Sequence, residues 1–214
     1  DKADPRLFHT VALPGLPYKY NTELIYKNDW NRNSNVYGFY ASLKENVDPS
    51  CSCFRNINPF RGNSKNRIVI RYADVLLMRA EALIELNRSN EALPLINQVR
   101  QRAKQSTSMI PYATNADIAL YQDGVNITWN QENARKALRW ERRLEFAMEG
   151  SRFFDLVRWG IADQVLNDYF TKEKTRRPAI FSSAYFTKNK NEYIPIPQNQ
   201  IGYVKGIYKQ NAGF

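Results

Sequence analysis

Three glutamates lie four residues apart in ERRLEFAMEGSRFFDLVRWG, residues 141–160. Glu141, Glu145 and Glu149 would therefore share one face of a helix. Two carboxyl groups about 5–10 Å apart across an open cleft can serve as the acid and base of a glycoside hydrolase, and neighbours at i and i+4 can meet that spacing. The same three side chains could instead form ion pairs that hold a fold together.

The arginines around these glutamates favour the structural interpretation. Like charges four apart disfavour a helix by roughly a few tenths of a kcal/mol per pair, so cations should face the stripe. Arg152 and Arg158 follow a break at Gly150 and can fold back toward it. Neighbouring guanidinium groups lower the pKa of a carboxyl, whereas a general acid needs a raised pKa. We therefore expect interhelical ion pairs and no catalytic residue. Further candidate partners lie in the preceding helical segment: Arg71, Arg79, Arg100 and Arg102.

Two amphipathic helices are predicted within residues 71–105. In RYADVLLMRAEALIELN and in EALPLINQVRQRAKQ, apolar residues recur at intervals of three and four, which is one face of a helix. Two antiparallel helices in this length match a tetratricopeptide unit. One such unit cannot bury its own face, so we expect further units upstream of this chain.

The remaining segments divide by composition. Residues 1–70 are rich in proline, asparagine and aromatic residues, and are predicted to form a loop-rich candidate ligand face. Residues 106–129 are predicted to be a loop. Residues 130–170 form a helical block, which a capping box from Thr128 to Gln131 should open and in which Trp140 and Trp159 should be core. Residues 171–214 are predicted to be irregular, and all five segments to belong to one domain.

Charge and cysteine usage limit the function classes. The 214 residues carry a formal net charge of +10, but the basic residues are spread along the chain, so we favour a solvated basic surface over a nucleic-acid partner. No apolar run approaches the roughly 18 residues of a membrane span. Cys51, Cys53 and the only histidine, His9, are too few ligands for a zinc site. We expect no metal or cofactor; the two cysteines either pair or stay free.

Six ordered blocks resemble the C-terminal half of the SusD/RagB family: DPRL, IVIRYADVLLMRAEALIELN, EALPLINQVRQRA, ERRLEFAMEGSRFFDLVRWG, EYIPIPQNQI and QNAGF. The resemblance implies a mainly α fold of tetratricopeptide-like helix pairs, an alpha-alpha superhelix, with long irregular loops. It implies no enzymatic activity. It also implies that the glutamate block forms the fold, in agreement with the ion-pair argument.

The same resemblance implies a cellular setting. Family members are lipid-anchored at the outer-membrane surface of Bacteroidetes cells, where they bind glycans or other nutrients and sit on a SusC-like TonB-dependent transporter. The implied N-terminal lipid anchor is not in this chain, and the mid-chain Cys51 and Cys53 cannot carry it.

The densest combination of aromatic and polar residues is YKNDWNRNSNVYGFY, residues 26–40. Sugars stack their apolar faces on such rings and pair their hydroxyls with planar polar groups. Trp30 is the predicted stacking platform and Tyr37 a second ring; the alternative is that both pin the loop to the core. Trp129 is a second candidate. The predicted polar neighbours are Asp29, Asn31 and Arg32.

Three functions remain open at this stage. The first is non-enzymatic glycan binding for delivery to the transporter. The second is a transporter-docking scaffold that binds a non-glycan nutrient such as peptide. The third, which the arginines disfavour, is a glycoside hydrolase acting through Glu141, Glu145 or Glu149.

Overall fold

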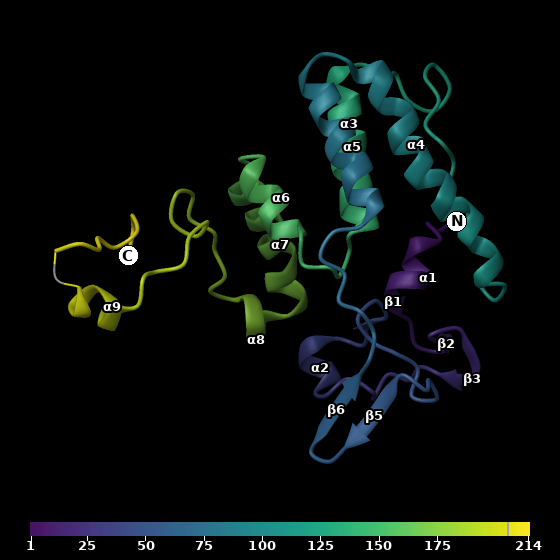
Figure 1. The fold of residues 1–214 in the computed structure, drawn as a ribbon, viewed down its shortest axis with the longest axis horizontal. Helices are drawn as coiled ribbons and strands as arrows, with labels where there is room; N and C mark the ends of the chain where they lie inside the picture. The colour runs from purple at the N-terminus through teal and green to yellow at the C-terminus, as the bar shows by residue number, and fades with distance from the viewer. Residues whose placement is uncertain (205) are drawn as a thin grey trace. The chain divides into compact units, whose positions relative to one another are not determined.

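A computed structural model describes residues 1–204 and 206–214 of the chain. The described residues fall into two units, Asp1–Gly150 and Ser151–Phe214. Helices predominate in both units, and the strands are short (Figure 1). Each unit is described by itself below.

Three helices form the framework of the first unit. They are α3 (Tyr72–Glu85), α4 (Ser89–Gln105) and α5 (Gln131–Glu145). All three contact one another, and α3 and α4 form the antiparallel pair that the sequence predicts for residues 71–105 (Figure 1). The turn between them places Asn87 at φ 60°, a left-handed conformation that asparagine tolerates better than most residues.

The largest apolar cluster of the chain lies between these helices. Its side chains sit at the predicted three- and four-residue spacing of α3 and α4, and small alanines let the helices approach closely. Trp129 completes the cluster from the loop before α5, and its indole nitrogen donates to the carbonyl of Ser89 at 2.9 Å. Trp129 is therefore a core residue. The fully buried members include Leu77, Ala80, Ile84, Ala92, Ile96 and Ala134.

Two details of α5 differ from the sequence prediction. Its N-cap is Asn130, whose side chain accepts from the backbone N–H of Asn133, so the predicted capping box from Thr128 to Gln131 is wrong; asparagine is among the strongest capping residues. Trp140 was expected in the packed seam, but it lies on the outer side of α5 and is 52% exposed.

Short helices and paired strands interrupt the loop predicted for residues 1–70. Helix α1 spans Arg6–Thr10 and α2 spans Ser34–Tyr37. The strands form three antiparallel pairs, β1 with β4, β2 with β3 and β5 with β6. Two small clusters centred on Phe8 and on Tyr26 supply the local core. The strands are β1 (Val11–Ala12), β2 (Pro17–Tyr18), β3 (Asn21–Ile25), β4 (Ala41–Ser42), β5 (Phe54–Ile57) and β6 (Phe60–Asn63).

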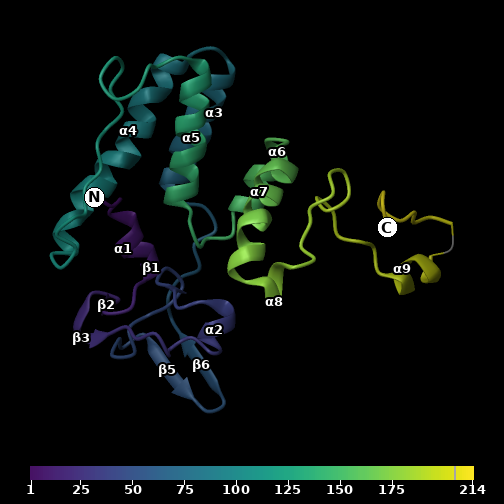
Figure 2. The ribbon, with the colours of Figure 1, turned by 180° about the vertical axis from the view of Figure 1, so that it is seen from behind.

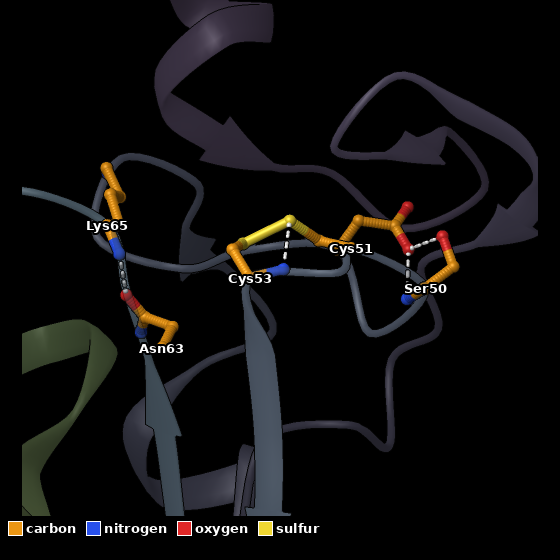
Figure 3. The surroundings of a disulfide bond; sticks show 6 residues. Ser50, Cys51, Cys53, Asn63 and Lys65 are labelled. Carbon is orange, nitrogen blue, oxygen red and sulfur yellow. Dashed lines mark hydrogen bonds between the residues drawn. A yellow bond between two sulfur atoms is a disulfide. The ribbon is translucent and has the colours of Figure 1, made fainter.

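A disulfide joins the two cysteines at the start of β5. Cys51 and Cys53 are bonded, and the backbone N–H of Cys53 also donates to the sulfur of Cys51 (Figure 3). The Cys53 carbonyl accepts from the backbone N–H of Ser64 at 3.0 Å. This answers the question that the sequence left open, since neither thiol is free.

The second unit is a smaller helical assembly. Leu156, Ala162 and Phe186 form its buried cluster. Gly160 adopts φ 66° in the turn between its first two helices, where a side chain would be strained. Helix α7 runs past residue 170, so regular structure continues into the segment predicted to be irregular. The helices are α6 (Arg152–Arg158), α7 (Ala162–Arg176), α8 (Pro178–Phe181) and α9 (Gln198–Tyr203).

The central cluster predicts a sharp contrast between a leucine of α3 and the leucine that follows this helix. Leu77 is fully buried, whereas Leu86 just after the helix is exposed. Leu77→Ala should lower the free energy of unfolding by about 2–5 kcal/mol, because it removes buried methyl groups and leaves a cavity. Leu86→Ala is the matched control and should change it little. Urea titration followed by circular dichroism measures both; equal effects would contradict the placement of the core.

Candidate functional site

The carboxylate stripe of α5 faces the interior of the first unit. Glu141 is 0% exposed and Glu145 is 2% exposed. Glu149 lies beyond the end of α5, where its side chain is partly accessible. A buried carboxylate is costly unless it is paired and hydrogen-bonded, so these positions require cations nearby.

Arginines from three other segments meet the two buried carboxylates. Glu141 accepts from Arg6 of α1 at 2.5 Å and from Arg100 of α4 at 2.9 Å. Glu145 accepts from Arg102 of α4 at 2.8 Å through both carboxylate oxygens, and from Arg71 at the start of α3. We call these six side chains the ion-pair cluster: Glu141, Glu145, Arg6, Arg71, Arg100 and Arg102.

Arg71 extends the cluster to Glu149. Its Nε donates to Glu149 at 3.0 Å, and its Nη2 donates to the backbone carbonyl of Glu145 at 2.7 Å. Lys44, from the loop after β4, donates to Glu149 at 2.5 Å and to the Glu145 carbonyl at 2.6 Å. The C-terminal end of α5 is thus joined both to the start of α3 and to residues 11–70, which we call the loop layer.

The surroundings of Glu145 and Glu149 favour the ionised form of each carboxyl group. Burial alone would raise the pKa of Glu145, but Arg102, Arg71 and Arg6 outweigh it and hold that pKa below its ordinary value. Burial likewise opposes ionisation of Glu149, and hydrogen bonds from Arg71 and Lys44 lower its pKa. A general acid requires the opposite shift and access to substrate. The arrangement supports the fold and is unsuited to glycoside hydrolysis.

Sequence reasoning identified some of these partners and missed others. Arg71 and Arg100 were among the expected cations, but Arg6 and Lys44 were not. Arg6 lies in the DPRL block, so its position in a recurring motif was an available signal. Arg158 pairs with Asp155 of its own helix at 2.9 Å. The predicted pairing of Arg152 and Arg158 with the glutamates stays a prediction.

Trp30 occupies an aromatic cluster in the loop layer. Its ring meets those of Tyr18 and Tyr26 edge-on, with centroids 5.5 and 5.3 Å apart. Tyr26 is buried, whereas Trp30 is 42% exposed. The two interpretations of Trp30 are therefore compatible, because one edge is fixed against the cluster while much of the ring remains accessible.

The other predicted ligand residues lie in the loop that follows. Asn31 closes it by donating from its side-chain amide to the carbonyls of Gly38 at 3.2 Å and Tyr40 at 2.7 Å. That amide nitrogen is engaged within the loop. Tyr37 of α2 is 65% exposed. Asp29 and Arg32 are exposed on either side of Trp30 and Asn31. The structure thus presents the exposed ring of Trp30 with the charged residues Asp29 and Arg32 near it in the chain.

Neither a metal cluster nor a membrane-spanning helix occurs in residues 1–204 and 206–214. No group of three or more His, Cys, Asp or Glu side chains there is arranged to hold a metal ion. No helix in the same residues has both the length and the apolar character needed to cross a bilayer.

Comparison with known proteins decides the family. A family model described as the SusD family matches residues 1–214. The chain belongs to the SusD family. Proteins of the SusD family in general bind nutrients such as glycans and are not catalysts, which fits an ion-pair cluster whose buried carboxylates are paired with arginines.

Several SusD-like proteins of Formosa agariphila are similar in sequence. SusD-like protein P25 is 35% identical over 183 residues, which are 82% of this chain and 30% of that protein. SusD-like protein P38 is 38% identical over 111 residues, 52% of this chain and 20% of that protein. The chain therefore spans about a third or less of the curated SusD-like relatives that it matches.

Solved SusD-like structures confirm the predicted fold. A SusD homolog from Bacteroides thetaiotaomicron matches with a TM-score of 0.68 and 26% identity, over 99% of this chain and 41% of that one. A SusD-like protein from Bacteroides fragilis matches with a TM-score of 0.64 and 19% identity, over 99% and 39%. The prediction of a mainly helical, SusD-like fold with tetratricopeptide-like helix pairs is correct.

The ion-pair cluster predicts that Glu145 is essential for stability. Glu145→Gln removes the charge that faces Arg6, Arg71 and Arg102, and should lower the free energy of unfolding by about 3–5 kcal/mol, as for other broken buried pairs. Glu132→Gln is the control, since Glu132 pairs with Lys136 on the exposed side of α5, and should have little effect. Denaturant titration measures both variants. Equal losses in the free energy of unfolding would refute the role of Glu145.

The cluster also predicts acid sensitivity. A carboxyl whose pKa is lower in the folded state stabilises the fold above its unfolded-state pKa, and that stabilisation is lost as the pH falls through the folded-state pKa. Glu145 and Glu149 both have lowered pKa values. The melting temperature should therefore fall as the pH drops below about 4.5, and fall less steeply in Glu145→Gln. An equal slope in both proteins would contradict the assignment.

Proposed function

We propose that the chain is the C-terminal part of a non-enzymatic protein that binds glycans at the bacterial cell surface and delivers them to a TonB-dependent outer-membrane transporter. The observation that carries the proposal is the exposed ring of Trp30, fixed edge-on by Tyr18 and Tyr26 and followed by charged and amide side chains. Membership of the SusD family supports the same function.

The geometry of Trp30 suits a sugar ring for physical reasons. Two aromatic neighbours limit the motion of the indole, so little conformational entropy is lost when a ligand stacks on it. The apolar face of a pyranose can then cover a ring that is otherwise in contact with water. Asp29 and Arg32, both exposed, offer a carboxylate acceptor and guanidinium donors to the hydroxyls at the edge of the sugar.

The proposal includes the cellular setting that the family suggests. A lipid anchor N-terminal to this chain would hold the protein at the outer-membrane surface, and a SusC-like transporter would receive the glycan. No nucleic acid, metal or cofactor takes part in it. We propose no catalysis, because the carboxylates spaced for it are buried and paired with arginines.

Loss of the two exposed rings tests the proposal directly. In the full-length protein, Trp30→Ala should reduce retardation in polysaccharide-containing gels to that of a non-binding protein, and Tyr37→Ala should reduce it partly, because stacking area is lost. Trp140→Ala is the matched control, since it removes an exposed tryptophan from α5. Circular dichroism should show the same fold in all three variants.

The outcomes separate the candidate functions. Retention unchanged in both loop variants would contradict glycan binding at this loop. Absence of retention by wild-type protein across plant, host and microbial polysaccharides would favour a scaffold that carries a non-glycan nutrient such as peptide. Release of reducing sugar by the wild type, lost in Glu145→Gln, would overturn the non-enzymatic assignment.

A further inference from the structure

Four arginines of the loop layer are exposed and unpaired. Arg32, Arg55, Arg61 and Arg67 all lie on the surface, and none forms an ion pair with a carboxylate of residues 1–204 or 206–214. The arginines of the ion-pair cluster behave differently, because each is engaged by a glutamate. The loop layer therefore keeps guanidinium groups available for an external anion.

The strand register places two of these arginines on a projecting ribbon. In the β5–β6 pair, Arg55 lies opposite Gly62 and Arg61 lies opposite Asn56. Successive side chains of a strand alternate between faces, so the two guanidinium groups lie on opposite faces of the ribbon. At its tip, Ile57 and Phe60 face each other and are 67% and 75% exposed. The ribbon thus combines an exposed apolar surface with arginine, as the Trp30 loop does with Trp30 and Arg32.

Contacts within the loop layer tie this ribbon to the Trp30 loop. Beyond β6, Lys65 donates its amino group to the carbonyl of Lys44. Lys19, next to the ring that contacts Trp30, donates to the adjacent carbonyl of Leu43 at 2.5 Å. Burial, and then the nearby charge of Lys65, lower the pKa of Lys19. Lys19 and Lys65 therefore donate to adjacent carbonyls of one segment. Helix α2 and the β5–β6 ribbon belong to the same unit (Figures 1 and 2).

The acidic residues of the same layer do not cancel this charge. They carry fewer charges than the cations, and one of them, Asp48, is engaged by the hydroxyl and backbone N–H of Ser50. The acidic residues of this layer are Glu23, Asp29, Glu45 and Asp48, and its cations are Lys19, Lys27, Arg32, Lys44, Arg55, Arg61, Lys65 and Arg67. Of these cations, Lys44 is engaged by Glu149.

We propose that the loop layer selects acidic polysaccharides, whose sulfate esters or uronate carboxylates pair with Arg32 and, on the two faces of the β5–β6 ribbon, with Arg55 and Arg61, while sugar faces stack on Trp30. The inference rests on the proposed glycan-binding function and narrows its substrate class. Guanidinium groups hold such oxyanions through two parallel hydrogen bonds, which a lysine cannot do. Each exposed pair contributes little alone, so selectivity comes from a charged chain that meets several arginines in succession.

Matched polysaccharide pairs test this class. Binding of the full-length protein is measured by isothermal titration against polygalacturonate and its methyl ester, and against dextran sulfate and dextran. The acidic member of at least one pair should bind about tenfold more tightly, and its advantage should shrink as NaCl rises from about 50 to about 500 mM, because salt screens exposed charges. The two pairs distinguish carboxylate from sulfate recognition.

Arginine variants locate the effect. Arg32→Gln, and the double variant Arg55→Gln with Arg61→Gln, should each weaken acidic-glycan binding about threefold or more and leave neutral-glycan binding unchanged. Arg88→Gln is the matched control. It removes an exposed arginine from the turn after α3, a helix of 14 residues, so it lies roughly 20 Å from the end of α3 that joins the loop layer.

The outcomes distinguish this inference from the function on which it rests. Equal affinity for neutral and acidic members, still lost in Trp30→Ala, would overturn acidic selectivity and leave glycan binding standing. Equally tight binding of polyglutamate or duplex DNA would show a general polyanion surface and overturn it too. Failure to bind any polysaccharide would overturn both proposals. Acidic-glycan binding that both Arg32→Gln and the Arg55→Gln, Arg61→Gln double variant leave unchanged would overturn the assignment of the anion site to these arginines.

Discussion

The first unit depends on two buried carboxylates and on the arginines that neutralise them. Glu141 and Glu145 lie on one helix, whereas their partners come from α1, from the start of α3 and from α4. A buried ion pair adds little net stability compared with apolar packing, but removing one member leaves an uncompensated charge. The cluster therefore favours one arrangement of these segments, because alternative arrangements would bury the glutamates without cationic partners.

This requirement connects the helices to the loop layer. The apolar cluster of α3, α4 and α5 could form without residues 1–70, since its members come from the helices and the loop before α5. Arg6 and Lys44 tie that bundle to the loops that carry Trp30. Asp4 in turn holds Arg6 through three hydrogen bonds. The candidate ligand surface is thus positioned by charge as well as by apolar contact.

Sequence reasoning located features that depend on neighbouring residues, but it missed contacts between residues far apart in the chain. The spacing of apolar residues located α3 and α4, because helix periodicity is a local property. The spacing of the three glutamates required cationic partners for Glu145 but could not identify Arg6, which lies 139 residues away. Trp140 was placed in the core from its spacing, yet a helix with buried glutamates turns a different face inward. Charged side chains with partners can occupy positions that a periodicity argument reserves for apolar ones.

Only the residue types of the candidate site could be predicted from the sequence, and their contacts could not. Aromatic and polar density pointed to Trp30, but its edge contacts with Tyr18 and Tyr26 depend on how two short strands bring the loops together. The amide of Asn31 illustrates the same limit, because its donor hydrogens close the loop at Gly38 and Tyr40. Loop geometry of this kind comes from hydrogen bonds between residues without a repeating pattern.

The attachment points of the loop layer are few and widely spaced along the chain. Arg6, Lys44 and Arg71 reach the end of α5, and the segments between them carry most of the exposed aromatic residues of the first unit. Lengthening a surface loop is cheap, since each doubling of its length adds only about 0.6 kcal/mol of closure entropy. The two loop segments between Arg6, Lys44 and Arg71 can therefore diverge in length and sequence while these three contacts with α5 are retained. One framework could in this way acquire many different binding specificities through insertion and substitution in two loops.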